Sequence, residues 1–130
     1  MKKIIALLCV VLSGCAGTTK FQNHPDVASG AQAATIHVVR ANSAFGAALT
    51  APVYVDRYLI GRIGPGGYLT TKVPVGRVHV TSTTGDVIVR TEPNAEYFFE
   101  VSMPVQGWLY APDFNVVQIK KQQASAIIGN

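Results

Sequence analysis

The sequence predicts an all-β fold, an antiparallel sandwich or flattened barrel of seven or eight short strands. Short runs rich in Val, Ile, Thr and Tyr follow one another after residue 34, and Gly, Pro, Asn and Asp interrupt them at regular spacing. Apolar and polar side chains also alternate along two of these runs, as in strands with one buried face. Many short strands with turns at this spacing are typical of sandwiches and small barrels.

The individual strands are delimited by turn residues. We expect strands at residues 35–40, 53–56, 58–63, 68–73, 77–83, 87–91, 96–103 and 114–120. The expected turns lie at residues 64–67, 74–76, 84–86 and 92–95, where Gly, Pro, Asn and Asp are concentrated. In the tail, Ala124, Ile127 and Ile128 have helical spacing and precede Gly129-Asn130, which predicts a short C-terminal helix.

Alternation divides two strands into a core side and a solvent side. The core side is expected to hold Val78 and Val80 in one strand, and Tyr97, Phe99, Val101 and Met103 in the other. The solvent side is expected to hold Arg77, His79, Thr81, Glu100 and Ser102. We therefore predict that Val78, Val80, Phe99 and Val101 are buried.

Length and composition limit the classes of protein. With 130 residues, the chain has room for one domain, and 48% hydrophobic with 14% charged residues is unlike a disordered chain. The formal charge of +4 includes Lys2 and Lys3, so loss of the first residues leaves +2. The other basic residues, Arg40 among them, are scattered between acids, which is typical of a solvated surface. Nucleic acid is excluded as a partner, because phosphate binding needs clustered basic residues.

The N-terminus has the features of an export signal. Met1-Lys2-Lys3 is followed by an apolar run from Ile4 to Leu12, which is too short to span a bilayer. The next residues, Leu12-Ser13-Gly14-Cys15, resemble the lipobox of bacterial lipoproteins. This resemblance implies cleavage between Gly14 and Cys15, a diacylglyceryl group on Cys15 Sγ, and acylation of the new amine. The alternative is an ordinary signal peptide with a coincidental cysteine.

The lipobox interpretation divides the chain into three parts. Residues 1–14 form the signal peptide, residues 15–34 a lipidated tether, and residues 35–130 the β-domain with its tail. Cys9 leaves with the signal peptide, so the mature chain keeps only Cys15 and has no internal disulfide. In the lipoprotein pattern that this segment resembles, an Asp directly after the lipidated cysteine retains the protein in the inner membrane. Ala16 stands at that position, which favours the outer membrane, facing the periplasm. We expect the tether to be a flexible coil reaching about 24 Å, with His24 solvated.

A second resemblance concerns residues 35–119. The segments at residues 52–63, 67–80 and 92–99 follow the order strand, Asp turn, Ile-Gly, strand, Pro-x-Gly, strand. This order resembles a family of small bacterial lipoproteins with a domain of unknown function, and it resembles PEGA-type and prealbumin-like sandwiches. Arg57 stands where the family usually has the turn glycine, which leaves the type of that hairpin open. The resemblance implies a fold and no catalytic residues, because none are known for the family.

No residue pattern indicates catalytic chemistry, and we expect no catalytic residue, cofactor or metal. His37 and His79 lie in the middle of separate strands and lack the spacing of a zinc site. We expect His79 to face solvent and His37 to be a hydrogen-bonded strand histidine. The acids Asp56, Asp86, Glu92 and Asp113 fall at or near turns. The Gly-rich segment Gly64–Gly67 is interpreted as a hairpin turn.

One segment between strands has the composition of a contact surface. Residues 105–112 contain Trp108 and Tyr110, and aromatic residues are enriched at recognition surfaces. Trp108 and Tyr110 are therefore candidate contacts with a partner, although they could instead cap an open end of the sandwich. Phe45, in the loop at residues 41–51, is considered in the same way.

Together these features predict a non-enzymatic lipoprotein of the cell envelope, held to the membrane by its lipid and binding a protein or cell-wall partner. An exposed sheet edge can pair with a strand of such a partner. The alternative is a hydrolase acting on peptidoglycan or glycans. That alternative requires a pocket in which His37 or His79 lies within hydrogen-bond distance of a carboxylate.

Overall fold

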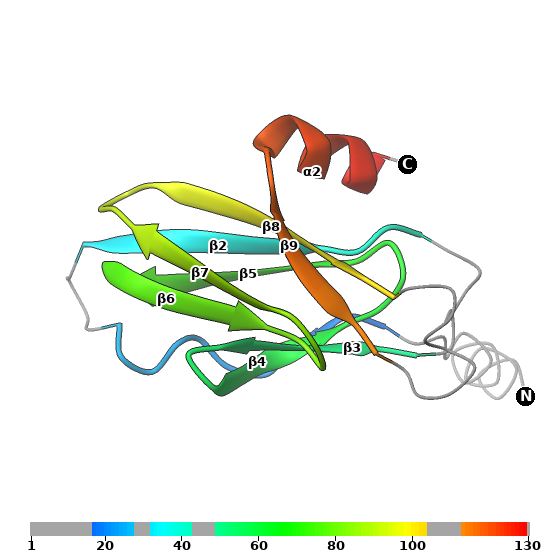
Figure 1. Ribbon diagram of the computed structural model, residues 1–130, viewed down its shortest axis with the longest axis horizontal. Coiled ribbons are helices and arrows are strands. Elements are labelled where there is room, and N and C mark those ends of the chain that lie inside the picture. The colour runs from blue at the N-terminus through cyan, green and yellow to red at the C-terminus, as the bar shows by residue number, and fades with distance from the viewer. Residues whose placement is uncertain (1–16, 28–31, 43–48, 104–112, 130) are drawn as a thin grey trace, which may run out of the picture.

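The computed structural model describes residues 17–27, 32–42, 49–103 and 113–129. Within these ranges, two sheets contribute to one hydrophobic core, and a short helix ends the chain (Figure 1). One sheet has five strands in the order β1-β4-β3-β6-β7, and the other has four in the order β5-β2-β8-β9. The all-β prediction is confirmed, in the form of two separate sheets and not a closed barrel.

The bounds of the strands agree closely with the sequence prediction. The five-stranded sheet contains β1 (Thr19–Lys20), β4 (Tyr58–Ile63), β3 (Ala51–Val55), β6 (Gly76–Thr81) and β7 (Asp86–Thr91). The four-stranded sheet contains β5 (Tyr68–Pro74), β2 (Ala33–Val39), β8 (Glu96–Ser102) and β9 (Asn115–Ile119). The helix α2 (Lys121–Gly129) follows β9 directly. Each of the eight expected strands, and the expected terminal helix, is therefore present.

Three features of the topology differ from the expectation. First, β1 belongs to the segment expected to be a tether, and it pairs with the edge of β4. Second, β2 and β8 pair in parallel, whereas the other strand pairs are antiparallel. Third, the Gly64–Gly67 turn is not a hairpin. It is closed by a 3.0 Å bond from Gly67 N to Gly64 O, but it joins strands of different sheets.

The core lies between the two sheets and is built as the alternation predicted. Val78 and Val80 of β6, and Phe99 and Val101 of β8, are all 0% exposed. Tyr97 and Met103 are partly buried and pack against the same core cluster. Each fully buried side chain of this size stabilises the fold by about 1.5–3 kcal/mol relative to exposure. The predicted buried set is confirmed.

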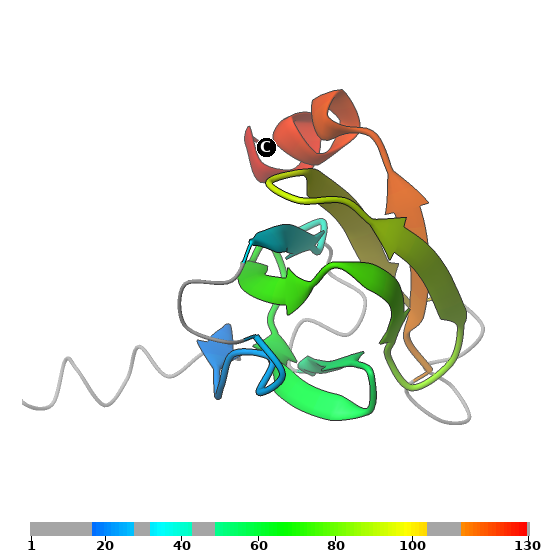
Figure 2. The same ribbon diagram turned by 90° about the vertical axis from the view of Figure 1, so that its left-hand side faces the viewer.

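A smaller apolar contact lies on the other side of the four-stranded sheet. The helix α2 contacts β8 and β2, and Figure 2 shows it beside that sheet. Val39 and Ala124 are both buried, although neither belongs to the main core cluster. The amide of Lys120 donates a 2.9 Å hydrogen bond to Gln123 Oε1, which caps the first turn. Ile128 stays 48% exposed, so the helix buries only part of its expected apolar side.

The expectation that Arg40 belongs to the solvated surface is wrong, because its side chain is buried. Arg40 follows β2, is 4% exposed, and donates hydrogen bonds from Nη1 to the carbonyls of Leu49 and Ile63 at 2.7 and 3.0 Å. Its guanidinium carbon lies 4.8 Å from the centre of the Phe114 ring. Burial lowers the pKa of Arg40 from its ordinary value. Its side chain therefore joins the ends of several strands, a role that charge pattern alone does not indicate.

Candidate functional site

The expectation that His24 is solvated is wrong. Its side chain is fully buried, and its Nε2 lies 2.9 Å from Asp56 Oδ2. The chain reaches this position because β1 pairs with β4 and Phe21 N then donates a 2.7 Å bond to Ile60 O. The residues after β1 therefore follow the surface of the domain instead of leaving it.

Local hydrogen bonds determine the tautomer of His24. The amide of Asp26 lies 3.1 Å from His24 Nδ1, and a backbone amide can only donate. Nδ1 is therefore the acceptor, and Nε2 carries the proton that is donated to Asp56 Oδ2. The Tyr58 ring meets the imidazole edge-on, with ring centres 5.1 Å apart. His24 is held on three sides.

Asp56 connects three parts of the fold. It lies in the turn between β3 and β4, and its Oδ1 accepts a 2.9 Å bond from the amide of His79. Its own amide donates a 2.9 Å bond to His79 O. Because Oδ2 binds His24, a single carboxylate ties the N-terminal segment and β6 to this turn. The position of Asp56 in a turn is confirmed, and its three long-range hydrogen bonds are additional.

The backbone at Asp56 and Arg57 shows the type of this hairpin, which the sequence left open. Asp56 and Arg57 have φ angles of 50° and 73°, so both occupy the left-handed region. Two such residues between paired strands form a type I′ hairpin turn, which favours Gly at the second position. Arg57 adopts the left-handed backbone conformation that glycine favours, and its side chain makes that conformation strained.

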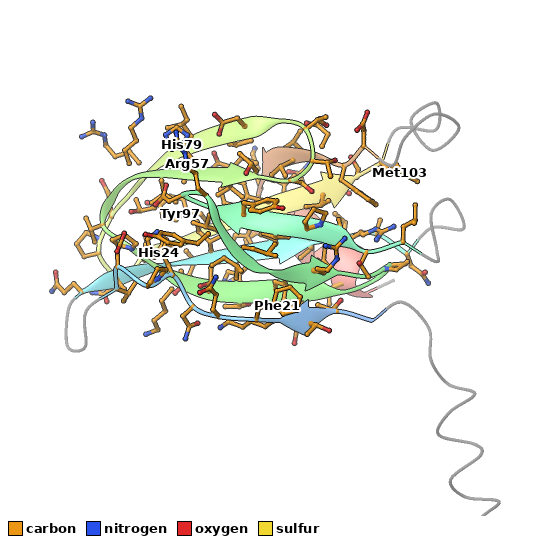
Figure 3. All side chains as sticks on the ribbon, turned by 90° about the horizontal axis from the view of Figure 1, so that it is seen from below. Phe21, His24, Arg57, His79, Tyr97 and Met103 are labelled. Atoms are coloured by element: carbon orange, nitrogen blue, oxygen red, sulfur yellow. The ribbon has the colours of Figure 1, made fainter. Side chains whose placement is uncertain are left out.

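A polar hollow of about 350 Å³ lies beside this turn and is lined by Asp56, Arg57, His79, Thr81 and Asp86. His79 Nδ1 is 3.3 Å from Asp86 Oδ1, and the two side chains are 41% and 54% exposed. The predicted exposure of His79 is confirmed. Figure 3 shows His24, Arg57 and His79 at the same end of the molecule. This end is rich in hydrogen-bonding groups and open to water.

The second histidine cluster lies on the outer side of the four-stranded sheet. His37 Nδ1 is 2.9 Å from Thr70 Oγ1, and its Nε2 is 2.9 Å from Glu96 Oε1. The Phe98 ring stacks on the imidazole at 4.7 Å between centres. The prediction of a hydrogen-bonded strand histidine is confirmed. The order hydroxyl, imidazole, carboxylate is also the order of groups in nucleophilic catalysis.

Metal binding finds no support in the part of the chain that the structure describes, since no group of three or more His, Cys, Asp or Glu there is arranged to hold an ion. The four candidate site residues Cys15, Phe45, Trp108 and Tyr110 lie outside the described residues.

His24 is the site residue that sequence analysis missed. The signal that could have found it is the short run Phe21, His24, Pro25 and Asp26, which combines an aromatic residue, an imidazole and a tight turn in a segment otherwise of linker composition.

Comparison with family models, with curated proteins and with solved structures finds no match to this chain. Among the described residues, no helix is both long and apolar enough to cross a membrane. Any function must therefore be argued from the geometry of these residues.

Proposed function

We propose that the protein is a lipid-anchored module of the cell envelope, cut before Cys15, that binds a protein or cell-wall partner without catalysing a reaction. The observation that carries this proposal is the attachment of the chain to the domain immediately after Cys15. Thr18 Oγ1 accepts a 3.1 Å bond from Gly64 N, and β1 begins at the next residue. A lipid on Cys15 would thus be joined to an ordered edge of the five-stranded sheet.

This attachment changes the geometry that a flexible tether implies. Only Ala16 and Gly17 separate Cys15 from Thr18, so the lipidated residue reaches about 10 Å from the sheet when extended. The expected reach was about 24 Å. The β1 edge is therefore held beside the membrane, and the rest of the five-stranded sheet extends away from it. Such a fixed orientation suits a module that presents one surface to a partner.

Membrane fractionation of Cys15→Ser tests the anchor. We expect the wild-type protein in the membrane fraction, and the variant either uncut or released, because several acyl chains bind a bilayer stably. Cys9→Ser is the matched control and is expected to behave as the wild type, since Cys9 lies in the segment removed. Wild-type protein in the released fraction would contradict the proposal.

A specific observation supports the hydrolase as a second candidate. Thr70, His37 and Glu96 are arranged as hydroxyl, imidazole and carboxylate at 2.9 Å each. Glu96 also lines a hollow of about 450 Å³ beside Phe98 and the start of α2. However, the side chains of His37 and Glu96 are 22% and 50% exposed, and solvent weakens the electrostatic stabilisation that catalysis needs. We therefore favour the binding module.

Hydrolysis assays separate the two candidates. We expect the purified protein to show no turnover of esters, peptidoglycan or glycosides above the His37→Ala/His79→Ala double variant. Turnover by the wild type that is lost in the double variant and in Thr70→Val would establish the hydrolase. Thr70→Val keeps the shape of the side chain and removes only the hydroxyl.

A further inference from the structure

Two arginines lie directly opposite each other on the outer side of the five-stranded sheet. Arg77 of β6 pairs in register with Arg90 of β7, and both are exposed. Like charges at directly opposed positions of an antiparallel pair are destabilising. The pair therefore acts against the stability of the hairpin that carries it.

No acid of the described residues forms an ion pair with either arginine. The three ion pairs of these residues are all between a histidine and a carboxylate, and Arg77 and Arg90 take part in none of them. Arg57 is likewise without an ion pair among the described residues, although it adopts a strained conformation. Of the acids near this side, Asp56 and Asp86 are bound by His24 and His79, and the exposed Glu92, two residues after Arg90, forms no ion pair with the described residues.

The surroundings of the arginine pair suit an extended peptide. The next residue pair along the hairpin is His79 and Ile88, and Ile88 is 47% exposed. The strand β7 is an edge of its sheet, with β6 as its only paired neighbour. At the Arg90 end of this edge, the carbonyl of Arg90 already accepts a 3.3 Å hydrogen bond from the Tyr97 hydroxyl, so the exposed side chains, and not this part of the backbone, are available to a partner. An exposed apolar side chain and two guanidinium groups therefore lie together on this side of the hairpin.

The position of this surface separates it from the proposed anchor. The strands β1 and β7 are the two opposite edges of the same sheet, four strand spacings apart, which is about 19 Å. The β1 edge continues toward Cys15 and the β7 edge does not. A membrane that holds the lipid therefore lies at the other edge from Arg77 and Arg90.

We propose that the outer side of the β6–β7 hairpin, with Arg77, Arg90 and Ile88, binds an extended acidic segment of a partner protein together with Arg57 of the adjacent β3–β4 turn. Carboxylates of the segment form charge-assisted, bidentate hydrogen bonds with the arginines and remove their mutual repulsion. An apolar side chain of the segment covers Ile88. The choice of a protein over the anchoring membrane rests on the proposed function, while the need for an anionic partner rests on the arginine pair alone.

Charge reversal tests this surface in the mature full-length protein, kept in detergent. The probe is a fluorescent peptide of about twelve residues with the repeat Glu-Ser-Val-Ser, which places Glu and Val on the same face of an extended chain. We expect Arg77→Glu and Arg90→Glu each to weaken its binding about tenfold or more. Lys72→Glu on β5 is the matched control, because the same charge change on the other sheet is expected to alter binding less than about twofold.

Thermal unfolding of the same variants excludes misfolding as the cause. Each single reversal creates an Arg–Glu pair across β6 and β7, so the melting temperature is expected to stay equal or rise. Loss of binding together with retained stability supports the proposal. Absence of peptide binding by the wild type, or equal weakening by Lys72→Glu, overturns it.

Vesicles of phosphatidylglycerol and phosphatidylcholine test whether the arginine surface binds an anionic membrane instead of a peptide. Vesicle binding that depends on Arg77 and Arg90, without peptide binding, would assign the surface to a membrane and overturn the proposal. The mass of the Cys15 residue is measured on the same sample. Peptide binding by protein with unmodified Cys15 would overturn the anchor but not the acidic docking surface.

Discussion

His24 Nε2 lies 2.9 Å from Asp56 Oδ2, so a residue only nine positions after Cys15 is fixed to the turn between β3 and β4. The pair is buried on the histidine side, and the carboxylate is 25% exposed. The same carboxylate accepts the amide of His79. The position of the N-terminal segment and the geometry of the turn therefore depend on each other.

Removal of His24 should destabilise the domain measurably. We expect His24→Ala to lower the free energy of unfolding by about 1–3 kcal/mol, because Asp56 loses a partner and a buried ring is removed. Urea denaturation measures this change. His79→Ala removes an exposed imidazole and should cost less than about 1 kcal/mol. Equal effects of the two substitutions would mean that the hydrogen bond between His24 and Asp56 does not stabilise the domain.

A methyl group at Gly61 should displace β1. A Cβ there would lie 2.3 Å from the carbonyl oxygen of Thr19, which is backbone and cannot rotate away. We expect Gly61→Ala to separate β1 from β4 and to expose the bond after Lys20 to trypsin. Limited proteolysis followed by mass spectrometry measures the rate of that cleavage, and cleavage after Lys121 in α2 serves as the internal reference. An unchanged rate after Lys20 would mean that β1 does not protect it.

The buried side chain of Arg40 should contribute to the free energy of unfolding through its hydrogen bonds. Arg40→Met retains much of the volume but leaves the carbonyls of Leu49 and Ile63 without their donor. We expect a loss of about 2–4 kcal/mol in thermal unfolding. Arg40→Lys keeps the charge and one donor group and should lose less. Unchanged stability of the Met variant would contradict this role.

The strain at Arg57 should be relieved by glycine. Because Arg57 has a φ of 73°, Arg57→Gly is expected to raise the free energy of unfolding by about 0.5–1 kcal/mol. The control is Lys72→Gly, in the extended strand β5, where glycine should instead lower stability. Thermal unfolding of both variants provides the measurement. Destabilisation by Arg57→Gly would show that the guanidinium itself stabilises the turn.

The sequence predicted those parts of the fold that depend on local patterns. Alternation placed Val78 and Phe99 in the core because a strand has a period of two residues, whichever strand lies beside it. Turn residues likewise marked the ends of the strands. Local chemistry does not determine which sheet receives the next strand, so the turn at Gly64–Gly67 was interpreted as a hairpin although it crosses between sheets.

The candidate site was harder to predict, because its contacts join distant residues. His24 and Asp56 are 32 positions apart, and His37 and Glu96 are 59 positions apart. The first pair depends on β1 adding to a sheet edge from a segment of linker composition. The second depends on the parallel pairing of β2 with β8. The run at residues 21–26 is a local signal for the first pairing, whereas the second has none in the sequence near His37.

The central claim is that a lipid on Cys15 holds the β1 edge of this domain at the membrane, and mass spectrometry of the N-terminal tryptic peptide of the membrane-bound protein tests it most directly. Trypsin cleavage after Lys20 should release a peptide that begins at Cys15 and carries a diacylglyceryl group, with or without acylation of its amine. A peptide that begins at Ile4, which trypsin would release from an uncut chain, or one that begins at Cys15 without any acyl mass, would contradict the claim.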